Sequence, residues 1–246
     1  MTRWAVVVPF KGGADAKSRL TESLGDGERA AIAVAFLVDT VRAVSRVPAV
    51  SSVIVVSNQP GLAAELAAAV ARPPGSADVE TQVIPDPGGG VNAAVASGLA
   101  HLRAAAPGAC TAAVTGDLAA LRPTDLTQAF HLAEAAATAG ARLTFVPDRE
   151  GSGTTMVALA PGAHAATHFG IGSCAAHTTA GYRALALPPE SSLRLDIDDA
   201  TDLERARLLG LGEATRAVLE WTVTSRSSDP ATRPALGPDR DRGRVR

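Results

Sequence analysis

A chain of 246 residues with 46% hydrophobic content can bury one large core, and its formal net charge of −2 lacks the basic excess typical of a nucleic-acid-binding surface. No apolar run approaches the roughly 20 residues of a membrane span, and the N-terminus leads directly into an expected strand rather than a signal peptide. We therefore expect a cytoplasmic protein with no nucleic-acid partner and no membrane contact, whose two cysteines, Cys110 and Cys174, are reduced.

Short apolar runs alternate along the chain with segments of helical periodicity. The runs are continuous and rich in β-branched residues, which is typical of strands buried on both faces, and they occupy residues 4–8, 53–56, 82–84, 111–114 and 143–146. Helical spacing covers residues 32–44, 61–71, 92–105 and 123–138. This alternation predicts an α/β fold with a mostly parallel central sheet in a single domain.

Ligands bind parallel α/β sheets at the carboxyl ends of the strands. The loops that follow the expected strands are residues 9–19, 85–92, 115–122 and 147–155, so we expect them to share one edge of the sheet. The chemistry of the protein should lie there.

The loop after the first strand, PFKGGADAKSRL, holds both lysines of the chain, Lys11 and Lys17. A P-loop would need glycine at Ala16, and the dinucleotide motif GxGxxG is absent, which disfavours a P-loop kinase and a standard NAD enzyme. A glycine turn that delivers Lys11, Lys17 and Arg19 to the sheet edge suits the phosphates of a nucleoside triphosphate. The alternative is a solvated surface loop.

Acidic residues follow a different expected strand. Asp117 lies just after the run at 111–114, and strand alternation over 193–198 sends Asp196 and Asp198 to one face, opposite three apolar side chains. Magnesium is commonly held by one or two carboxylates together with substrate phosphates, so these three residues are a candidate Mg²⁺ site. In the competing interpretation, Asp198 or Asp199 caps a helix at about 200–209.

Three histidines invite a metal interpretation that the pattern disfavours. His164 and His168 have helical spacing, but their segment is short and bounded by glycine, and no HExxH motif is present. His177 is either a core histidine or a residue that helps to hold an anionic substrate.

The composition changes after Leu219, where the sequence becomes rich in Pro, Ser, Arg and Asp. Such a segment contains few apolar side chains that could be buried in a core. We expect one folded domain over residues 1–220 and a disordered tail over 221–246.

Several segments together resemble the 2-phospho-L-lactate or phosphoenolpyruvate guanylyltransferases, which make a guanylylated phosphoester for the deazaflavin coenzyme F-420. In chain order they are PFKGGADAKSRL, ERAAIAVAFLVD, PDPGGGVNAAVASG, TGDLAAL, PDREGSGTTMV, FGIGSCAAH and RLDIDDATDL. The resemblance covers about residues 3–212 and implies the Rossmann-like nucleotidyltransferase fold of the molybdenum-cofactor guanylyltransferases.

Carried over residue by residue, the resemblance implies a nucleotide site and a metal site. The first loop would hold the GTP phosphates through Lys11, Lys17, Ser18 and Arg19. Asn92 would read the base or ribose, and Asp117, Asp196 and Asp198 would hold magnesium. Lys17, Arg19 and Asp117 are thus the expected catalytic residues.

For the acceptor, the resemblance points to Thr155, Gly170 and Ser173. Ser173 opens an expected helix, whose N-terminus would present free amides to an anion. Thr154 and Thr155 stand where many relatives carry GTN, which looks like the phosphoenolpyruvate-using branch, and Ala119 stands where relatives often have proline.

The expected reaction is attack by an acceptor phosphate oxygen on the α-phosphorus of GTP, with release of pyrophosphate. The expected partners are GTP and a three-carbon phospho-acid, either phosphoenolpyruvate or 2-phospho-L-lactate, and a homodimer stays open. The alternatives are another small-molecule nucleotidyltransferase, of the molybdenum-cofactor or sugar-phosphate type, and a non-catalytic sensor of a phosphorylated metabolite.

Overall fold

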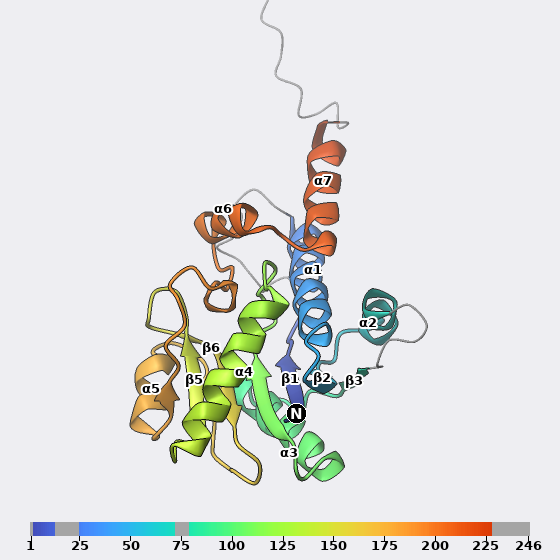
Figure 1. Ribbon diagram of the computed structural model, residues 1–246. Helices are drawn as coiled ribbons and strands as arrows, with labels where there is room; N and C mark the ends of the chain where they lie inside the picture. Colours follow the sequence, from blue (N-terminus) through green and yellow to red (C-terminus); the bar gives the residue numbers. More distant parts are fainter. Residues whose placement is uncertain (1, 13–24, 72–78, 228–246) are drawn as a thin grey trace, which may run out of the picture.

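The computed structural model describes residues 2–12, 25–71 and 79–227, and side chains as far as residue 222. A seven-stranded sheet in the order β3-β2-β1-β4-β6-β5-β7 forms its centre (Figure 1). None of the helices in these described ranges combines the length and the apolar character needed to cross a bilayer.

Five of the seven strands lie where the apolar runs predict them. These are β1 (Trp4–Pro9), β2 (Val50–Val56), β3 (Glu80–Ile84), β4 (Cys110–Val114) and β5 (Leu143–Pro147). The sequence reading missed β6 (Thr154–Leu159) and β7 (Arg183–Ala184). β6 lies antiparallel between β4 and β5, and β7 pairs in parallel with β5, so the sheet is mixed at this end.

The helices follow the predicted alternation. They are α1 (Asp26–Ser45), α2 (Leu62–Val70), α3 (Val91–Ala105), α4 (Pro123–Thr138), α5 (Ser173–Thr179), α6 (Ala200–Leu209) and α7 (Glu213–Ser227). α4 has proline at its first position, where the missing amide hydrogen costs nothing. α7 continues past residue 220, where the sequence predicts a disordered tail, and residues 228–246 lie outside the described ranges.

Helices cover both faces of the sheet (Figure 1), and alternate residues of β1 pack against them. Trp4, Val6 and Val8 share one core cluster with α1, α2 and α4, whereas Ala5 and Val7 share another with α3. α3 lies very close to the sheet, because a Cβ added at Gly98 would stand 2.6 Å from a methyl carbon of Val7. The glycine is therefore needed for this helix to dock.

A third cluster ties the C-terminal part of the chain to α1. Ile32 and Phe36 of α1 pack with the segment after β4 and with the buried side chains of Leu195, Ile197, Leu203 and Ala206. Because Leu195 and Ile197 lie in this core, the acidic residues that alternate with them point the other way.

Candidate active site

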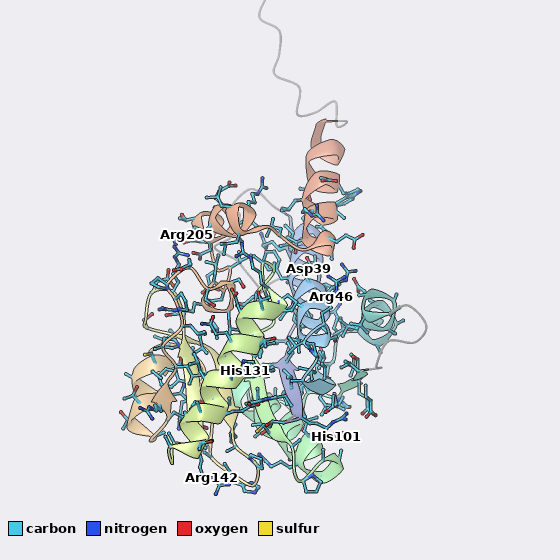
Figure 2. The ribbon with its side chains drawn as sticks, viewed as in Figure 1. Asp39, Arg46, His101, His131, Arg142 and Arg205 are labelled. Carbon is cyan, nitrogen blue, oxygen red and sulfur yellow. The ribbon has the colours of Figure 1, made fainter. Side chains whose placement is uncertain are left out.

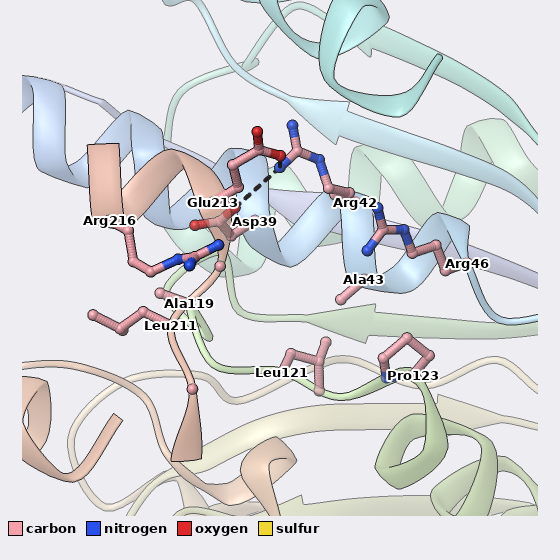
Figure 3. A pocket seen from close by; sticks show the side chains of 12 residues that line it. Asp39, Arg42, Ala43, Arg46, Ala119, Leu121, Pro123, Leu211, Glu213 and Arg216 are labelled. Carbon is pink, nitrogen blue, oxygen red and sulfur yellow. Dashed lines mark hydrogen bonds and ion pairs between the residues drawn. The ribbon is translucent and has the colours of Figure 1, made fainter. Parts of the chain in front are cut away.

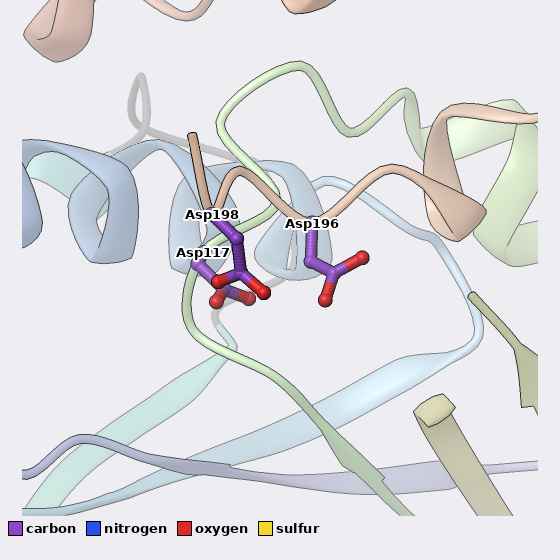
Figure 4. A group of neighbouring side chains, drawn as sticks. All are labelled: Asp117, Asp196 and Asp198. Atoms are coloured by element: carbon purple, nitrogen blue, oxygen red, sulfur yellow. The ribbon is translucent and has the colours of Figure 1, made fainter. Parts of the chain in front are cut away.

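Three carboxylates meet beside the carboxyl end of β4. Asp117 follows that strand, and Asp196 and Asp198 come from the segment between η1, a short 3-10 helix (Ser192–Arg194), and α6 (Figure 4). One carboxylate oxygen from each lies within 4.8 Å of the others. The predicted grouping of Asp117, Asp196 and Asp198 in space is therefore found.

The local backbone that presents these acids differs from the prediction. Residues 193–198 are not a strand but the end of η1 followed by an irregular segment. The alternation survives, because Leu193, Leu195 and Ile197 are buried while Asp196 is half-buried and Asp198 exposed. The backbone amide of Ile197 donates to the carbonyl of Asp117 at 3.2 Å, which joins the two acidic segments directly.

Helix capping is carried by the neighbouring aspartate. Asp199 is the N-cap of α6, and its Oδ1 accepts from the amides of Thr201 at 2.7 Å and Asp202 at 3.0 Å. Asp199, and neither Asp196 nor Asp198, is therefore the N-cap of this helix.

Burial and neighbouring negative charges both raise the pKa of Asp196. Desolvation, then the carboxylates of Asp117 and Asp198, raise its pKa from an ordinary 3.8 to about 8. A nearby cation would stabilise the charged form of these neighbouring carboxylates. Three oxygen ligands suit a hard divalent cation such as Mg²⁺, so the residues present fit such an ion.

A second acidic group shares Asp196. One oxygen each from Asp148, Glu150 and Asp196 also lie within 4.8 Å of one another. Asp148 is buried and accepts from the amides of Ser152 at 2.9 Å and Gly153 at 2.7 Å. Sequence reasoning missed Asp148, although its place in the predicted edge loop at 147–155 was a usable signal.

Arginines hold the loop that carries Asp148 and Glu150. Nη2 of Arg194 donates to the carbonyl of Asp148 at 2.9 Å. Arg205 of α6, labelled in Figure 2, lies 3.0 Å from Asp202 and 3.7 Å from Glu150. The loop after β5 and the acidic segment before α6 are thus fixed to each other.

Lys11 is exposed at the carboxyl end of β1, where the sequence predicts it. Gly12 follows at φ +67, a backbone conformation that favours glycine. The other predicted phosphate-binding residues, Lys17, Ser18 and Arg19, lie outside the described residues.

The loop after β3 contains three consecutive glycines, Gly88, Gly89 and Gly90, at φ values from 80 to 89. Oδ1 of Asp86 accepts from the amide of Gly88 at 2.8 Å. Asn58, in the loop after β2, exchanges two hydrogen bonds with the backbone of Asp86. The loops after β2 and β3 are thereby joined at the edge that carries Lys11.

Asn92 connects this edge to the loop before α5. Its Oδ1 accepts from the amide of Phe169 at 2.8 Å and from Oγ1 of Thr167 at 2.9 Å, and its Nδ2 donates to the carbonyl of Phe169 at 3.0 Å. The predicted contact with base or ribose stays a prediction, and the structure adds a joining role for this side chain.

The predicted acceptor residues occupy three different environments. Thr155 is fully buried in β6, and its hydroxyl donates to the carbonyl of Leu193 at 2.6 Å. Gly170 is exposed at φ +125, and Ser173 is buried at the start of α5. Thr155 thus supports the segment that carries Asp196.

His177 is a core histidine that organises the loop around Gly170. Its Nδ1 lies 2.9 Å from the carbonyl of Ser173 and 3.1 Å from Oγ1 of Thr154, and its Nε2 accepts from the amide of His168 at 3.0 Å. Burial lowers its pKa to about 4, so the ring is neutral near pH 7.

Relatives identify the class of protein that carries this arrangement. Residues 4–231 match the family model described as "Guanylyl transferase CofC like". The phosphoenolpyruvate guanylyltransferase of Streptomyces coelicolor is 43% identical over 88% of this chain and 95% of its own length. That of Thermomonospora curvata is 44% identical over 87% of this chain and 88% of its own length.

Solved structures share the fold at low sequence identity. A putative nucleotide-diphospho-sugar transferase from Desulfovibrio desulfuricans aligns with a TM-score of 0.62 at 15% identity, covering 91% of this chain and 96% of its own. A 4-diphosphocytidyl-2C-methyl-D-erythritol synthase aligns with a TM-score of 0.52 at 14% identity, covering 85% and 99%. The predicted nucleotidyltransferase fold is confirmed, and the chain belongs to the CofC-like guanylyl transferase family.

Proposed function

We propose that this protein transfers GMP from GTP to the phosphate of phosphoenolpyruvate, releasing pyrophosphate, as a step of coenzyme F-420 biosynthesis. The observation that carries the proposal is the cluster of Asp117, Asp196 and Asp198 in a chain of this family. The relatives in Streptomyces coelicolor and Thermomonospora curvata, both named phosphoenolpyruvate guanylyltransferase, support this choice of acceptor.

The reaction must bring two polyanions together. An acceptor phosphate oxygen, already ionised near neutral pH, attacks the α-phosphorus of GTP, so no side-chain base is required. Two unit charges 4 Å apart repel by about 4 kcal/mol at an effective dielectric near 20, and several such pairs would prevent the approach. Catalysis is therefore mainly positioning and charge compensation.

Asp117, Asp196 and Asp198 are the residues that would hold a divalent cation, and we propose Mg²⁺. Bound there, the ion supplies positive charge that offsets the phosphate oxygens. The raised pKa of Asp196 supports this assignment, since that carboxyl group is costly to ionise without a cation beside it.

On the nucleotide side, Lys11, Lys17, Ser18 and Arg19 would bind the GTP phosphates, with Lys17 and Arg19 stabilising the charge on the leaving pyrophosphate. Lys11 is exposed at the strand end that leads into this loop, which supports its part in the proposal. Asn92 would contact base or ribose through the N–H that its bonds to Phe169 and Thr167 leave over.

On the acceptor side, Gly170 and Ser173 would face the phosphorylated acid, with the buried Thr155 acting from behind through its bond to the Leu193 carbonyl. The buried Ser173 and the exposed, positive-φ Gly170 lie in one turn, where the Ser173 amide donates to the Gly170 carbonyl at 3.1 Å. That turn is held by His177 and Asn92, so its geometry is set in advance of binding.

The test is product formation from purified full-length protein. GTP and MgCl₂ are incubated with phosphoenolpyruvate, 2-phospho-L-lactate or 3-phosphoglycerate, with mass detection of the product, and ATP, CTP and UTP replace GTP in parallel. We expect a guanylylated phosphoenolpyruvate and stoichiometric pyrophosphate.

Asp117→Asn is the matched inactive control, and it should keep the melting temperature within a few degrees while losing turnover. GTP binding without pyrophosphate release from any acceptor would favour a sensor and contradict the proposal. Preference for another nucleotide, or for a sugar phosphate, would place the protein with other nucleotidyltransferases.

A further inference from the structure

A cavity of about 280 Å³ lies outside the acidic site. It is bounded by the C-terminal half of α1, the loop leading into α4 and the turn before α7 (Figure 3). Its apolar floor includes Ala43, Ala119 and Leu121, and three arginines line it: Arg42, Arg46 and Arg216. Neither the three clustered aspartates nor Lys11 belongs to its lining.

One of the arginines is neutralised by acids in the same wall. The Asp39 side chain is 2% exposed and accepts from the amides of Ala214 at 3.1 Å and Thr215 at 2.8 Å, at the start of α7. Nη1 of Arg42 lies 3.6 Å from Asp39 and 3.1 Å from Glu213. Arg42 thus bridges the two acids, and Asp39 is also bound by the start of α7.

The other two arginines have no such partner. Arg46 and Arg216 are exposed and form no ion pair with any other described residue. Figure 3 shows their guanidinium groups pointing toward each other from opposite ends of the cavity, above Ala43 and Leu121. Two arginines without an ion-pair partner among the described residues therefore face each other over an apolar surface, and the lining as a whole is net positive, with three arginines against two acids.

We propose that this cavity binds a small organic phosphate, with its phosphoryl group between Arg46 and Arg216 and its apolar body on the floor. A phosphomonoester carries close to two negative charges at neutral pH, whereas one carboxylate carries a single charge. The dianion therefore matches the two arginines, and the guanidinium fork matches phosphate oxygens in geometry. The cavity volume suits a metabolite smaller than a nucleotide.

The bound molecule would lie against the loop that carries Asp117. Ala119 is two residues beyond Asp117, and its carbonyl accepts from the amide of Gly212 at 2.8 Å. Oγ1 of Thr40, the residue after Asp39 in α1, accepts a hydrogen bond from the amide of Leu118 at 3.1 Å. The site is nevertheless separate from the acidic site, and the proposal does not depend on guanylyl transfer.

Calorimetry of the full-length protein tests the charge argument. At pH 8 with EDTA present, the probes are phenyl phosphate, inorganic phosphate and benzoate. We expect phenyl phosphate to bind more tightly than either of the others. Equal or tighter binding of benzoate would contradict the argument that the site prefers a dianion. Equal binding of inorganic phosphate would contradict the assignment of an organic ligand and would indicate a site for free phosphate.

In the double variant Arg46→Gln/Arg216→Gln, the affinity for phenyl phosphate should fall on the order of tenfold for each arginine removed. If the remaining affinity is too low to measure, the isotherm should show one equivalent of bound ligand fewer. Both residues are exposed, so the melting temperature should hold. Arg183→Gln, an exposed arginine of β7, is the matched control and should bind as the wild type does. An unchanged isotherm in the double variant would overturn the proposal.

A crystal of the chelated protein soaked in phenyl phosphate locates the ligand. The phosphoryl group should lie between the guanidinium groups of residues 46 and 216. Density confined to the carboxyl ends of the strands would assign the binding to the nucleotide site instead and refute this cavity. Failure of guanylyl transfer would leave both measurements intact, so the two proposals fail separately.

Discussion

At the scale of single residues, burial changes the pKa values of two ionisable side chains, because a charged group is less stable away from water. Asp196 is the clearest case, since burial and its acidic neighbours raise its pKa to about 8. His177 is the opposite case, because burial lowers its pKa to about 4 and keeps the ring neutral. Each pKa shift makes the free energy of unfolding depend on pH, and the direction of the shift determines whether stability rises or falls with pH.

Replacement of Asp196 by Asn should stabilise the metal-free protein while abolishing activity. The pKa of this group is raised by folding, so wild-type stability in EDTA falls as pH rises from about 4 toward about 8, and the Asn variant lacks this loss. The gain at pH 7 should be about 1–3 kcal/mol by urea unfolding. Glu190→Gln, at an exposed acid, is the control, and a less stable Asp196→Asn protein would contradict the charge argument.

The pKa of His177 is lowered by folding, so only the unfolded chain takes up its proton between pH 6.5 and about 4. Its contribution to stability is therefore complete above pH 6.5 and is lost as pH falls through that window. His177→Gln should lower stability at pH 7 and flatten the pH dependence by about 2 kcal/mol between pH 7 and 4.5. The exposed His101, changed to Gln, should leave the slope as it is; identical slopes in all three proteins would refute the assignment.

At the scale of elements, the acidic site is assembled from segments far apart in the chain. β6 holds η1 through Thr155, and the loop after β4 holds the segment with Asp196 through the amide of Ile197. Gly98 allows α3, which begins directly after the glycine loop that follows β3, to pack against Val7 of β1. Precision at the site therefore depends on contacts that no ligand touches.

Thr155→Val should reduce turnover by about tenfold and stability by about 1–2 kcal/mol, because the carbonyl of Leu193 loses its 2.6 Å partner inside the core. Thr155→Ser keeps the hydroxyl and should retain most of both. Pyrophosphate release and thermal unfolding provide the measurements. If the Val variant changed only the KM for the acceptor, Thr155 would be a substrate contact and not a support.

Gly98→Ala should destabilise the protein by about 1–2 kcal/mol, although alanine favours helices, because the new methyl group would stand 2.6 Å and 2.9 Å from the two methyl carbons of Val7. Gly27 of α1 has nothing within 4 Å of an added Cβ and is the matched control. Gly27→Ala should be neutral or stabilising. A stabilising Gly98→Ala would show that α3 can move away from the sheet.

At the scale of the whole molecule, the sequence predicts the strands whose carboxyl ends carry the candidate site. It misses β6 and β7, which lie in the mixed part of the sheet. Buried strands appear in the sequence as apolar runs, so β1, β2, β4 and β5 are predictable together with the loops at their carboxyl ends. β3 is located by the same signal, but the expected burial on both faces is wrong for it, because it is the edge strand and none of its residues is buried. β6 is not predictable in this way, because it follows a glycine-rich loop and enters between β4 and β5 in the opposite direction. Strand order depends on pairing across the sheet, which no local pattern records.

The candidate site was predictable where residue type alone decides the chemistry. Asp117, Asp196 and Asp198 come together as expected, because buried neighbours fix the direction of each side chain. The supporting roles of Thr155 and Asn92 could not be read from the sequence, since their partners, the carbonyl of Leu193 and the backbone of Phe169, are distant in the chain.

The packing of α1 against residues 195–206 has a consequence for biosynthesis. Ile32 and Phe36 leave the ribosome early, but their apolar cover of Leu195, Ile197, Leu203 and Ala206 emerges about 160 residues later. At ordinary translation speeds this delay is on the order of ten seconds. Throughout it the side chains of Ile32 and Phe36 lack these packing partners and the carboxylate cluster is incomplete, so we expect the unfinished polypeptide to be inactive and prone to association through this apolar surface.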